Sequence, residues 1–379
     1  MARLKEYNGH YCESEYEYAF IGFLEAEGWR YSSGNNIRRV TKRDVLIADD
    51  FKKFIADTNP DLTEDEVTQI YDNVRLVGAE SDFATLHKVY GWMVNGVQFT
   101  PQDELPGMIP LIDFDNWDKN IFRVVNQFTV EYTNNGQKEN RRPDVLLFVN
   151  GMPLCVVELK NPADANATIY DAWEQINIRY WRDIPHLLHY CPLACISDGV
   201  KTRLGTVRTP YEHFYAWRRV NEGDVVSTLP FAETETMIKG VYTPERFVEI
   251  FRDYIYFQDS IYDSDEVEIV CRYPQFFAAK LLKQSIVNSV VTRSGKGGTY
   301  FGATGCGKTY TMAFLARQLA LRCTDIPEIG SPTIILIVDR DELQKQGSKL
   351  FTKSKEFLNL GEVSVVKNRT QLRQELGAR

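Results

Sequence analysis

The chain has 379 residues, of which 44% are hydrophobic and 25% charged, and its formal net charge at pH 7 is −8. This length suits two or three domains, and the composition is that of an ordinary globular protein rather than a disordered one. No apolar run approaches a membrane span and the first residues hold no apolar signal core, so we expect a cytoplasmic protein with no membrane partner. The acidic balance argues against attraction of the whole chain to nucleic acid and leaves local basic patches open.

The cysteines are scattered and show no pattern of a disulfide framework or a zinc site, so we expect reduced thiols. Their positions are 12, 155, 191, 195, 271, 306 and 323.

Helical spacing of apolar residues predicts a first helix over 13–28, which Gly28 ends. Three more helices are expected over 44–59, 62–76 and 81–94, and Thr63 is positioned to cap the second of them. Residues 113–130 then change to a strand pattern, which alternates strongly from Phe122 onward, and residues 133–140 are predicted to be a loop.

Two short apolar strands follow, over 145–149 and 153–159, joined by a turn at Asn150-Gly151. Asp144 begins this hairpin and Glu158 and Lys160 end it, although charges at the ends of such apolar strands are costly unless something binds them. Glu158 and Lys160 are two residues apart and therefore share one face of their strand.

The register of the hairpin decides whether Asp144 lies on the same face as Glu158. Regular pairing across a two-residue loop places Asp144 opposite Val157, on the wrong face. A three-residue loop or one bulge places Asp144 opposite Glu158 instead. If the acidic pair is functional, the hairpin must contain one of these irregularities.

Two carboxylates on one face repel each other unless a cation lies between them, and oxygen ligands at an accessible strand end suit Mg²⁺. A metal ion beside Lys160 could activate water against a phosphodiester. The alternative is a structural ion pair at a sheet edge. The stretch RPDVLLFVNGMPLCVVELKNP, residues 142–162, resembles the PD-(D/E)xK nuclease superfamily, and in particular the nuclease domain of the restriction (motor) subunit of type I restriction–modification enzymes.

The resemblance implies that Asp144 and Glu158 bind Mg²⁺ and that Lys160 assists the attacking water. It also implies that a carboxylate from the first helix can join the metal ligands. Glu17 is the candidate, and the alternative is an exposed helix residue.

A helix is predicted over 163–180. The type I family carries a Gln and a Tyr four residues apart on this helix, but Gln175 and Tyr180 are five apart. One extra residue rotates a helical position by about 100°, which puts the equivalence of Gln175 in doubt. Residues 191–207 then read as strand, turn and strand, extending the same sheet.

Residues 221–240 read as a connecting stretch, and Pro244 opens a helix to about Phe257. The next chemical motif is residues 302–309, which fit G-x4-G-K-[ST] between an expected strand over 297–301 and a helix over 309–322. In this motif backbone N–H groups and Lys308 bind the phosphates of ATP, and Thr309 ligates Mg²⁺. The other loop residues in this role are Gly302, Thr304, Gly305, Cys306 and Gly307.

The apolar run over 332–338 predicts a buried parallel strand. Together with the residues that follow, it resembles the strand after the phosphate loop in superfamily two helicases, especially the type I motor. Upstream, Arg272, Tyr273 and Gln275 resemble the segment that contacts adenine in those motors, with Gln275 bonding the base. The alternative is that they lie on the surface of a helix start.

We therefore expect an α/β chain with three parts: a PD-(D/E)xK restriction-endonuclease-like domain over 1–240, a linker over 241–265, and an incomplete first RecA-like lobe of the superfamily two helicase type over 266–379. The resemblance implies a subunit of an ATP-dependent type I site-specific deoxyribonuclease, which uses Mg²⁺ and ATP on double-stranded DNA with methylation and specificity subunits. We expect the chain to be a fragment that binds ATP weakly and does not translocate.

Two other hypotheses remain open. One is a DNA-remodelling helicase-like ATPase whose N-terminal domain binds DNA or partner subunits without cutting. The other is a docking arm that attaches the motor to its partners through residues 44–110.

Overall fold

The structure is a computed structural model, and it divides into two compact units, residues 1–252 and 253–379. The division falls inside the segment expected to be a linker, and each unit is described by itself. The residues that the structure describes are 13–78, 80–102, 105–161, 168–227, 229, 231–258, 266–338, 341–358 and 363–377.

Unit 1 is built on a sheet that has six strands among the described residues, in the order β1-β4-β7-β8-β9-β10. β1 runs parallel to β4 and β8 parallel to β9, while the other neighbours are antiparallel. The four central strands are almost completely buried because helices cover both faces of the sheet. The strands are β1 (Arg30–Ser33), β4 (Phe122–Asn126), β7 (Val145–Val149), β8 (Met152–Leu159), β9 (Leu193–Ser197) and β10 (Thr202–Thr206).

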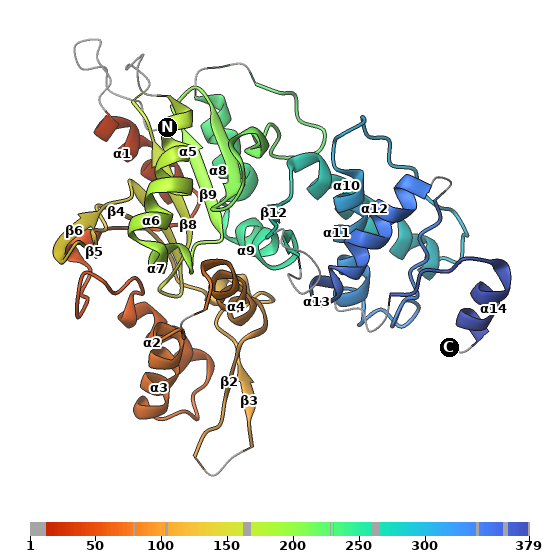
Figure 1. Ribbon diagram of the computed structural model, residues 1–379, viewed down its shortest axis with the longest axis horizontal. Coiled ribbons are helices and arrows are strands. Elements are labelled where there is room, and N and C mark those ends of the chain that lie inside the picture. The colour runs from red at the N-terminus through yellow and green to blue at the C-terminus, as the bar shows by residue number, and fades with distance from the viewer. Residues whose placement is uncertain are drawn as a thin grey trace. The chain divides into compact units, whose positions relative to one another are not determined.

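One face of this sheet carries α1 (Glu13–Ala26) and α8 (Ala232–Val241), which also pack on each other. The Tyr16 hydroxyl of α1 bonds Ser197 of β9 at 2.6 Å and Thr234 of α8 at 3.0 Å. The other face carries α5 (Ile169–Glu174) and η3 (Gln175–Tyr180), followed by α6 (Trp181–Asp183) and α7 (Pro185–Leu188) (Figure 1). The register of β8 with β9 assigns Glu158 to the η3 face and Ser197 to the α1 face.

The expected helices between the first helix and the sheet are α2 (Ala48–Thr58), α3 (Glu64–Arg75) and α4 (Asp82–Asn95). Thr63 caps α3 as predicted, in a capping box with Glu66. A short ribbon of β2 (Val97–Phe99) and β3 (Gly107–Ile109) follows.

Three predictions for unit 1 are wrong. The strand expected from residue 113 begins only with β4 at Phe122, because bends and a 3₁₀ turn, η2 (Trp117–Lys119), occupy the residues before it. Residues 133–140 are not a loop, because β5 (Val130–Asn134) and β6 (Gln137–Arg141) form a hairpin through Asn135-Gly136. The residues of this ribbon beyond Tyr132 are largely exposed, so β6 lacks the apolar alternation of a half-buried strand. Residues 221–240 are not only a connection, since α8 begins among them at Ala232 and buries Met237 and Ile238.

The helix expected over 243–257 is α9 (Pro244–Asp253), and the chain then changes to β11 (Ile255–Phe257). In unit 2, β11 pairs with β12 (Glu268–Val270), and α10 (Tyr273–Val291) packs on α11 (Lys308–Leu321). Buried Asp253 pairs with Arg322 at 2.8 Å. The remaining helices are α12 (Asp341–Thr352), α13 (Lys355–Leu358) and α14 (Arg369–Gly377).

The strands predicted over 297–301 and 332–338 are not found, and this prediction is wrong for the structure as described. Ile335 and Ile337 are 54% and 88% exposed. A parallel strand needs neighbouring strands for its hydrogen bonds and its burial. Within the described part of unit 2, the only sheet is the β11–β12 pair, which offers no such neighbour at 332–338.

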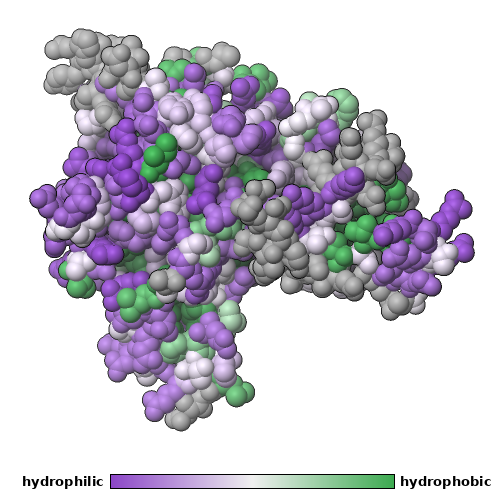
Figure 2. Space-filling model, in the orientation of Figure 1, coloured by the Kyte–Doolittle hydropathy of each residue, from purple (hydrophilic) through white to green (hydrophobic). Residues whose placement is uncertain are grey.

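The described helices include none that is both long and apolar enough to cross a membrane. The face drawn in Figure 2 intersperses hydrophilic residues with smaller groups of hydrophobic ones.

Candidate functional site

The hairpin that carries the acidic pair contains the irregularity that a functional site requires. Its loop is the two-residue turn Asn150-Gly151, with φ of 50° and 75°, and Val149 pairs with Met152. The register then shifts, because Phe148 pairs with Pro153 and Leu147 with Cys155, which leaves Leu154 as the extra residue of a bulge. Beyond the bulge Val145 pairs with Val157, so Asp144 lies opposite Glu158 on one face.

A backbone contact holds Asp144 in this place. Its Oδ2 accepts a hydrogen bond from the Leu159 N–H at 2.7 Å. The carboxylate is therefore tied to the end of β8 between Glu158 and Lys160.

Glu158 is fully buried, and its Oε1 accepts a 2.5 Å hydrogen bond from the Tyr180 hydroxyl. None of the residues that the structure describes donates a hydrogen bond to Oε2, which lies 4.0 Å from the Lys160 Nζ. Burial raises the pKa of Glu158 well above its usual range, and the charge of Asp144 raises it further. Lys160 and the bond from Tyr180 act in the opposite direction.

Lys160 completes a closed chain of polar contacts. Its Nζ donates to Gln175 Oε1 at 3.0 Å, and Gln175 Nε2 donates to the Tyr180 hydroxyl at 2.8 Å. Burial raises the pKa of Tyr180 well above its ordinary value, and the neighbouring Glu158 adds to the effect. Tyr180 is therefore a neutral hydrogen-bond donor at physiological pH.

The backbone conformation explains how Gln175 and Tyr180 both reach the site although they are five residues apart. The segment that contains both, η3, is a π-helix rather than an α-helix. A π-turn contains one more residue than an α-turn, so it absorbs the extra residue and keeps both side chains on the sheet side. The 100° rotation that an α-helix would impose on Gln175 does not occur.

Glu17 is on α1 and is only 7% exposed, so it is not the exposed helix residue of the alternative. Its Oε1 accepts hydrogen bonds from Asn126 Nδ2 at 2.6 Å and Gln127 Nε2 at 3.4 Å. Asn126 ends β4 and pairs with Val145, which places Glu17 at the same end of the sheet as Asp144. Its role as a metal ligand stays a prediction.

The residues present fit a magnesium ion. Asp144 and Glu158 offer carboxylate oxygens on one face, and the buried Oε2 of Glu158 lacks a donor among the described residues. In those same residues no three His, Cys, Asp or Glu side chains form a cluster that could enclose a metal ion. Mg²⁺ is the cation that accepts one or two carboxylates and keeps its remaining positions for water and phosphate.

The second candidate site is the loop over 302–309 in unit 2. Gly305 and Gly307 have φ of 78° and 81°, a conformation that glycine adopts without strain. Lys308 begins α11, and its exposed side chain donates to the carbonyls of Gly302 and Ala303 at 2.9 Å each. Thr309 follows it in the first turn of the helix. The loop thus has glycines at its turns and a helix N-terminus behind them, the arrangement that binds phosphate.

Gln275 lies against this loop. It is 4% exposed, its Nε2 donates to the Gly307 carbonyl at 3.1 Å, and its Oε1 accepts from the Arg272 N–H at 2.8 Å. A Cβ on Gly307 would lie 2.4 Å from that Nε2. Gln275 is therefore not a surface residue, and it connects the start of α10 to the phosphate loop.

Sequence reasoning missed a group of side chains that anchor η3. Trp173, Asn177 and Trp181 all donate to backbone carbonyls of residues 207 and 209. These three residues are spaced four apart, and residues four apart on a helix lie on the same face. That spacing was the signal in the sequence that they act together.

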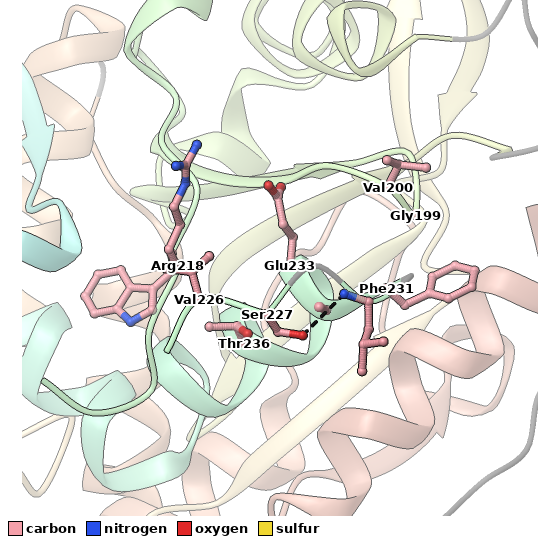
Figure 3. A pocket seen from close by; sticks show the side chains of 11 residues that line it. Gly199, Val200, Arg218, Val226, Ser227, Phe231, Glu233 and Thr236 are labelled. Carbon is pink, nitrogen blue, oxygen red and sulfur yellow. Dashed lines mark hydrogen bonds between the residues drawn. The ribbon is translucent and has the colours of Figure 1, made fainter. Parts of the chain in front are cut away.

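A separate cavity of 520 Å³ in unit 1 contains none of the predicted site residues. Gly199 and Val200 of the β9–β10 turn line it, together with the side chains of Arg218 and Glu233 (Figure 3). Glu233 is engaged there, because its Oε2 accepts from the Thr202 N–H at 3.0 Å.

Comparison with known proteins gives two family matches that cover most of the chain. A family described as "Type I restriction enzyme R protein N terminus" matches residues 11–213. A family described as "SWI2/SNF2 ATPase" matches residues 274–379.

Curated relatives extend across both units. A putative type I restriction enzyme MjaIXP endonuclease subunit of Methanocaldococcus jannaschii is 29% identical over 365 residues, 89% of this chain and 34% of the relative. The type I restriction enzyme HindI endonuclease subunit of Haemophilus influenzae is 28% identical over 384 residues, 96% of this chain and 35% of the relative. The chain thus spans about a third of the length of these relatives. Because the first family matches more than half of the chain, this protein belongs to the family of type I restriction enzyme R protein N-termini.

Proposed function

We propose that the chain is the nuclease-bearing part of a type I restriction endonuclease subunit, and that unit 1 hydrolyses phosphodiesters of double-stranded DNA with Mg²⁺. The observation that carries the proposal is the bulge at Leu154, which places Asp144 opposite Glu158 beside Lys160. In this proposal unit 1 has the PD-(D/E)xK fold, and unit 2 is the beginning of a RecA-like lobe.

Asp144 and Glu158 would hold the metal ion. Glu17, which accepts a hydrogen bond from Asn126 at the same end of the sheet, is the candidate for a further ligand. A bound Mg²⁺ would lower the pKa of its water and offset the charge that develops on phosphate. Lys160, held by Gln175, presents a positive charge to the same place. Tyr180 orients Glu158 by donating to its Oε1, which leaves Oε2 for a ligand.

Unit 2 would bind ATP at residues 302–309. Lys308 would exchange its bonds to the loop carbonyls for the β- and γ-phosphates, and Thr309 would ligate the nucleotide's Mg²⁺. Gln275 keeps the loop against α10 and is the candidate for contact with the base, with Arg272 beside it. ATP hydrolysis would drive DNA translocation in the full-length subunit, assembled with methylation and specificity subunits.

The test compares cleavage of circular duplex DNA by the full-length subunit in its complex, with ATP and Mg²⁺. Asp144→Ala is expected to abolish cutting while ATP hydrolysis continues, because it changes only the nuclease site. Lys308→Ala is expected to abolish both, since translocation precedes cutting. If Asp144→Ala cuts normally, the hairpin is structural, and a DNA-remodelling ATPase that binds without cutting becomes the better interpretation.

Matched controls separate these effects from loss of charge alone. Glu174→Ala removes a carboxylate at the end of α5 that pairs with Arg179 at 2.9 Å, outside the network. Lys296→Ala removes an exposed lysine of unit 2. Both variants should cut DNA and hydrolyse ATP as the unchanged protein does.

A further inference from the structure

The segment around the π-helix η3 is anchored to the turn that follows β10. Trp173 Nε1 donates to the Thr209 carbonyl at 2.9 Å, and Trp181 Nε1 donates to the Val207 carbonyl at 2.8 Å. Asn177 lies between them, and its Nδ2 donates to both carbonyls, at 3.0 Å to Val207 and 3.1 Å to Thr209. The carbonyls of the turn over 207–209 therefore fix the position of residues 173–181 through three side chains.

The same segment carries the residues that contact the acidic pair. Gln175 and Tyr180 are the first and last residues of η3, and they reach Lys160 and Glu158. Asn177 is the one anchor inside η3, because Trp173 belongs to α5 and Trp181 to α6.

A π-turn is rare and needs surrounding contacts to persist, because the α-helical bonding pattern is normally preferred. If η3 relaxed to an α-helix, five-residue spacing would place Gln175 and Tyr180 about 140° apart around the helix axis, about 100° more than four-residue spacing does. Either Lys160 would lose its acceptor or Glu158 would lose its donor. The alignment of this site therefore depends on what holds the π-register.

We propose that Asn177 is a positioning residue for the nuclease site, which it serves by holding η3 in the π-register against the 207–209 carbonyls. This inference rests on the proposed function, since it assigns Asn177 to the same reaction. Asn177 acts through Gln175 and Tyr180, since its own side chain bonds the carbonyls of Val207 and Thr209. Its two hydrogen bonds set the register on which the contacts of Lys160 and Glu158 depend.

The test uses the full-length subunit in its complex and compares Asn177→Ala with Ile178→Ala. Ile178 is the next residue of η3 and is 48% exposed, so its truncation controls for a change in this helix. Asn177→Ala is expected to lower DNA cleavage by about 10- to 100-fold, the usual cost of losing a residue that orients ligands. ATP hydrolysis should be unchanged, and Ile178→Ala should cut normally.

The decisive comparison introduces Asn177→Ala into a second protein from which Ile178 is deleted. The deletion makes Gln175 and Tyr180 four residues apart, so an α-helix can present both side chains and no π-turn is needed. In that background Asn177→Ala should have little further effect on cleavage. An equal loss in both backgrounds would overturn the proposal, since Asn177 would then support the fold without setting the register.

Two further readouts decide the question from Asn177→Ala alone if the deletion protein does not fold. Amide hydrogen exchange over 175–183 should become faster than in the unchanged protein. The rate constant of cleavage should fall while the affinity of the complex for DNA stays unchanged, because Lys160 and Glu158 lose their partners in η3. Unchanged exchange, or a loss of DNA affinity in place of a lower rate constant, would refute the positioning role.

Asp144→Ala, measured in parallel, separates this inference from the proposed function. If that variant cuts normally, the nuclease assignment fails and cleavage no longer reports on Asn177. The exchange measurement still decides whether Asn177 holds the π-register.

Discussion

Asp144 and Leu159 are joined across the hairpin by a hydrogen bond of 2.7 Å from the Leu159 N–H to the Asp144 carboxylate. Leu159 lies between Glu158 and Lys160, so this bond fixes one carboxylate to the backbone that presents the other charged groups. The position of Asp144 is therefore set by the strand that carries Glu158 and Lys160.

Lys160→Ala should lower DNA cleavage by about 10²- to 10³-fold, the usual cost of removing a group that stabilises developing charge. The Nζ lies 4.0 Å from Glu158 Oε2 and is held by Gln175, so its removal takes a positive charge away from the acidic pair. The measurement is the rate of supercoiled DNA nicking by the full-length subunit in its complex. Lys239→Ala, which removes a surface lysine paired with Glu235, is the control and should leave the rate unchanged. Retention of full activity by Lys160→Ala would exclude its role.

Tyr180→Phe should move the acidic limb of the cleavage rate to higher pH. The lost hydroxyl bond lowers the pKa of Glu158 in the unchanged protein, so its removal raises that pKa further and protonates Glu158 over a wider range. Cleavage at neutral pH should fall by about 10- to 100-fold and recover partly as the pH increases. A pH profile that is reduced in height but not displaced would contradict this explanation.

Glu158→Gln should abolish cleavage and stabilise the metal-free protein at neutral pH. The folded-state pKa of Glu158 is raised, so its contribution to stability is fully present below the unfolded value of about 4.3. That contribution is lost as the pH rises through the folded pKa. The neutral glutamine avoids this loss, and each 1 kcal/mol gained should raise the melting temperature by about 2–4 °C.

The measurement is thermal unfolding in EDTA between pH 4 and pH 9 for both proteins. Their melting temperatures should separate as the pH increases above the unfolded carboxyl value. Equal pH dependence in the two proteins would show that Glu158 does not carry the effect.

Gln275→Ala should weaken ATP binding about fivefold, which corresponds to one neutral hydrogen bond of about 1 kcal/mol. The lost bond is the one from Nε2 to the Gly307 carbonyl, which holds the phosphate loop against α10. The measurement is equilibrium binding of a fluorescent ATP analogue, with Lys296→Ala as the control. If Gln275 also bonds the base, the loss for ATP should exceed the loss for inorganic triphosphate.

The elements that the sequence predicted well are those whose signals are local. Thr63 with Glu66 marks the start of α3, and Asn150-Gly151 marks the turn of the central hairpin. The need for a bulge could also be stated in advance, because Asp144 and Glu158 share a face only if the register shifts. Its place at Leu154 could not, since every residue of β8 is apolar or buried and none marks the extra position.

The elements that were missed depend on tertiary context. β6 is a polar strand in a ribbon whose residues beyond Tyr132 are largely exposed, and its pairing with β5 outweighs its lack of alternation. The apolar run over 332–338 has the composition of a buried strand, but the described residues of unit 2 provide no sheet beside it. The π-turn at η3 was visible only as a spacing that did not fit an α-helix.

That π-turn has a consequence for how relatives of this chain are aligned. An alignment that demands a fixed interval between the helix Gln and Tyr would shift Gln175 by one column and report the position as lost. The side chain nevertheless reaches Lys160 and Tyr180. An alignment should therefore allow a gap between residues 176 and 179. There the π-helical backbone accommodates one extra residue without displacing the side chains of the site.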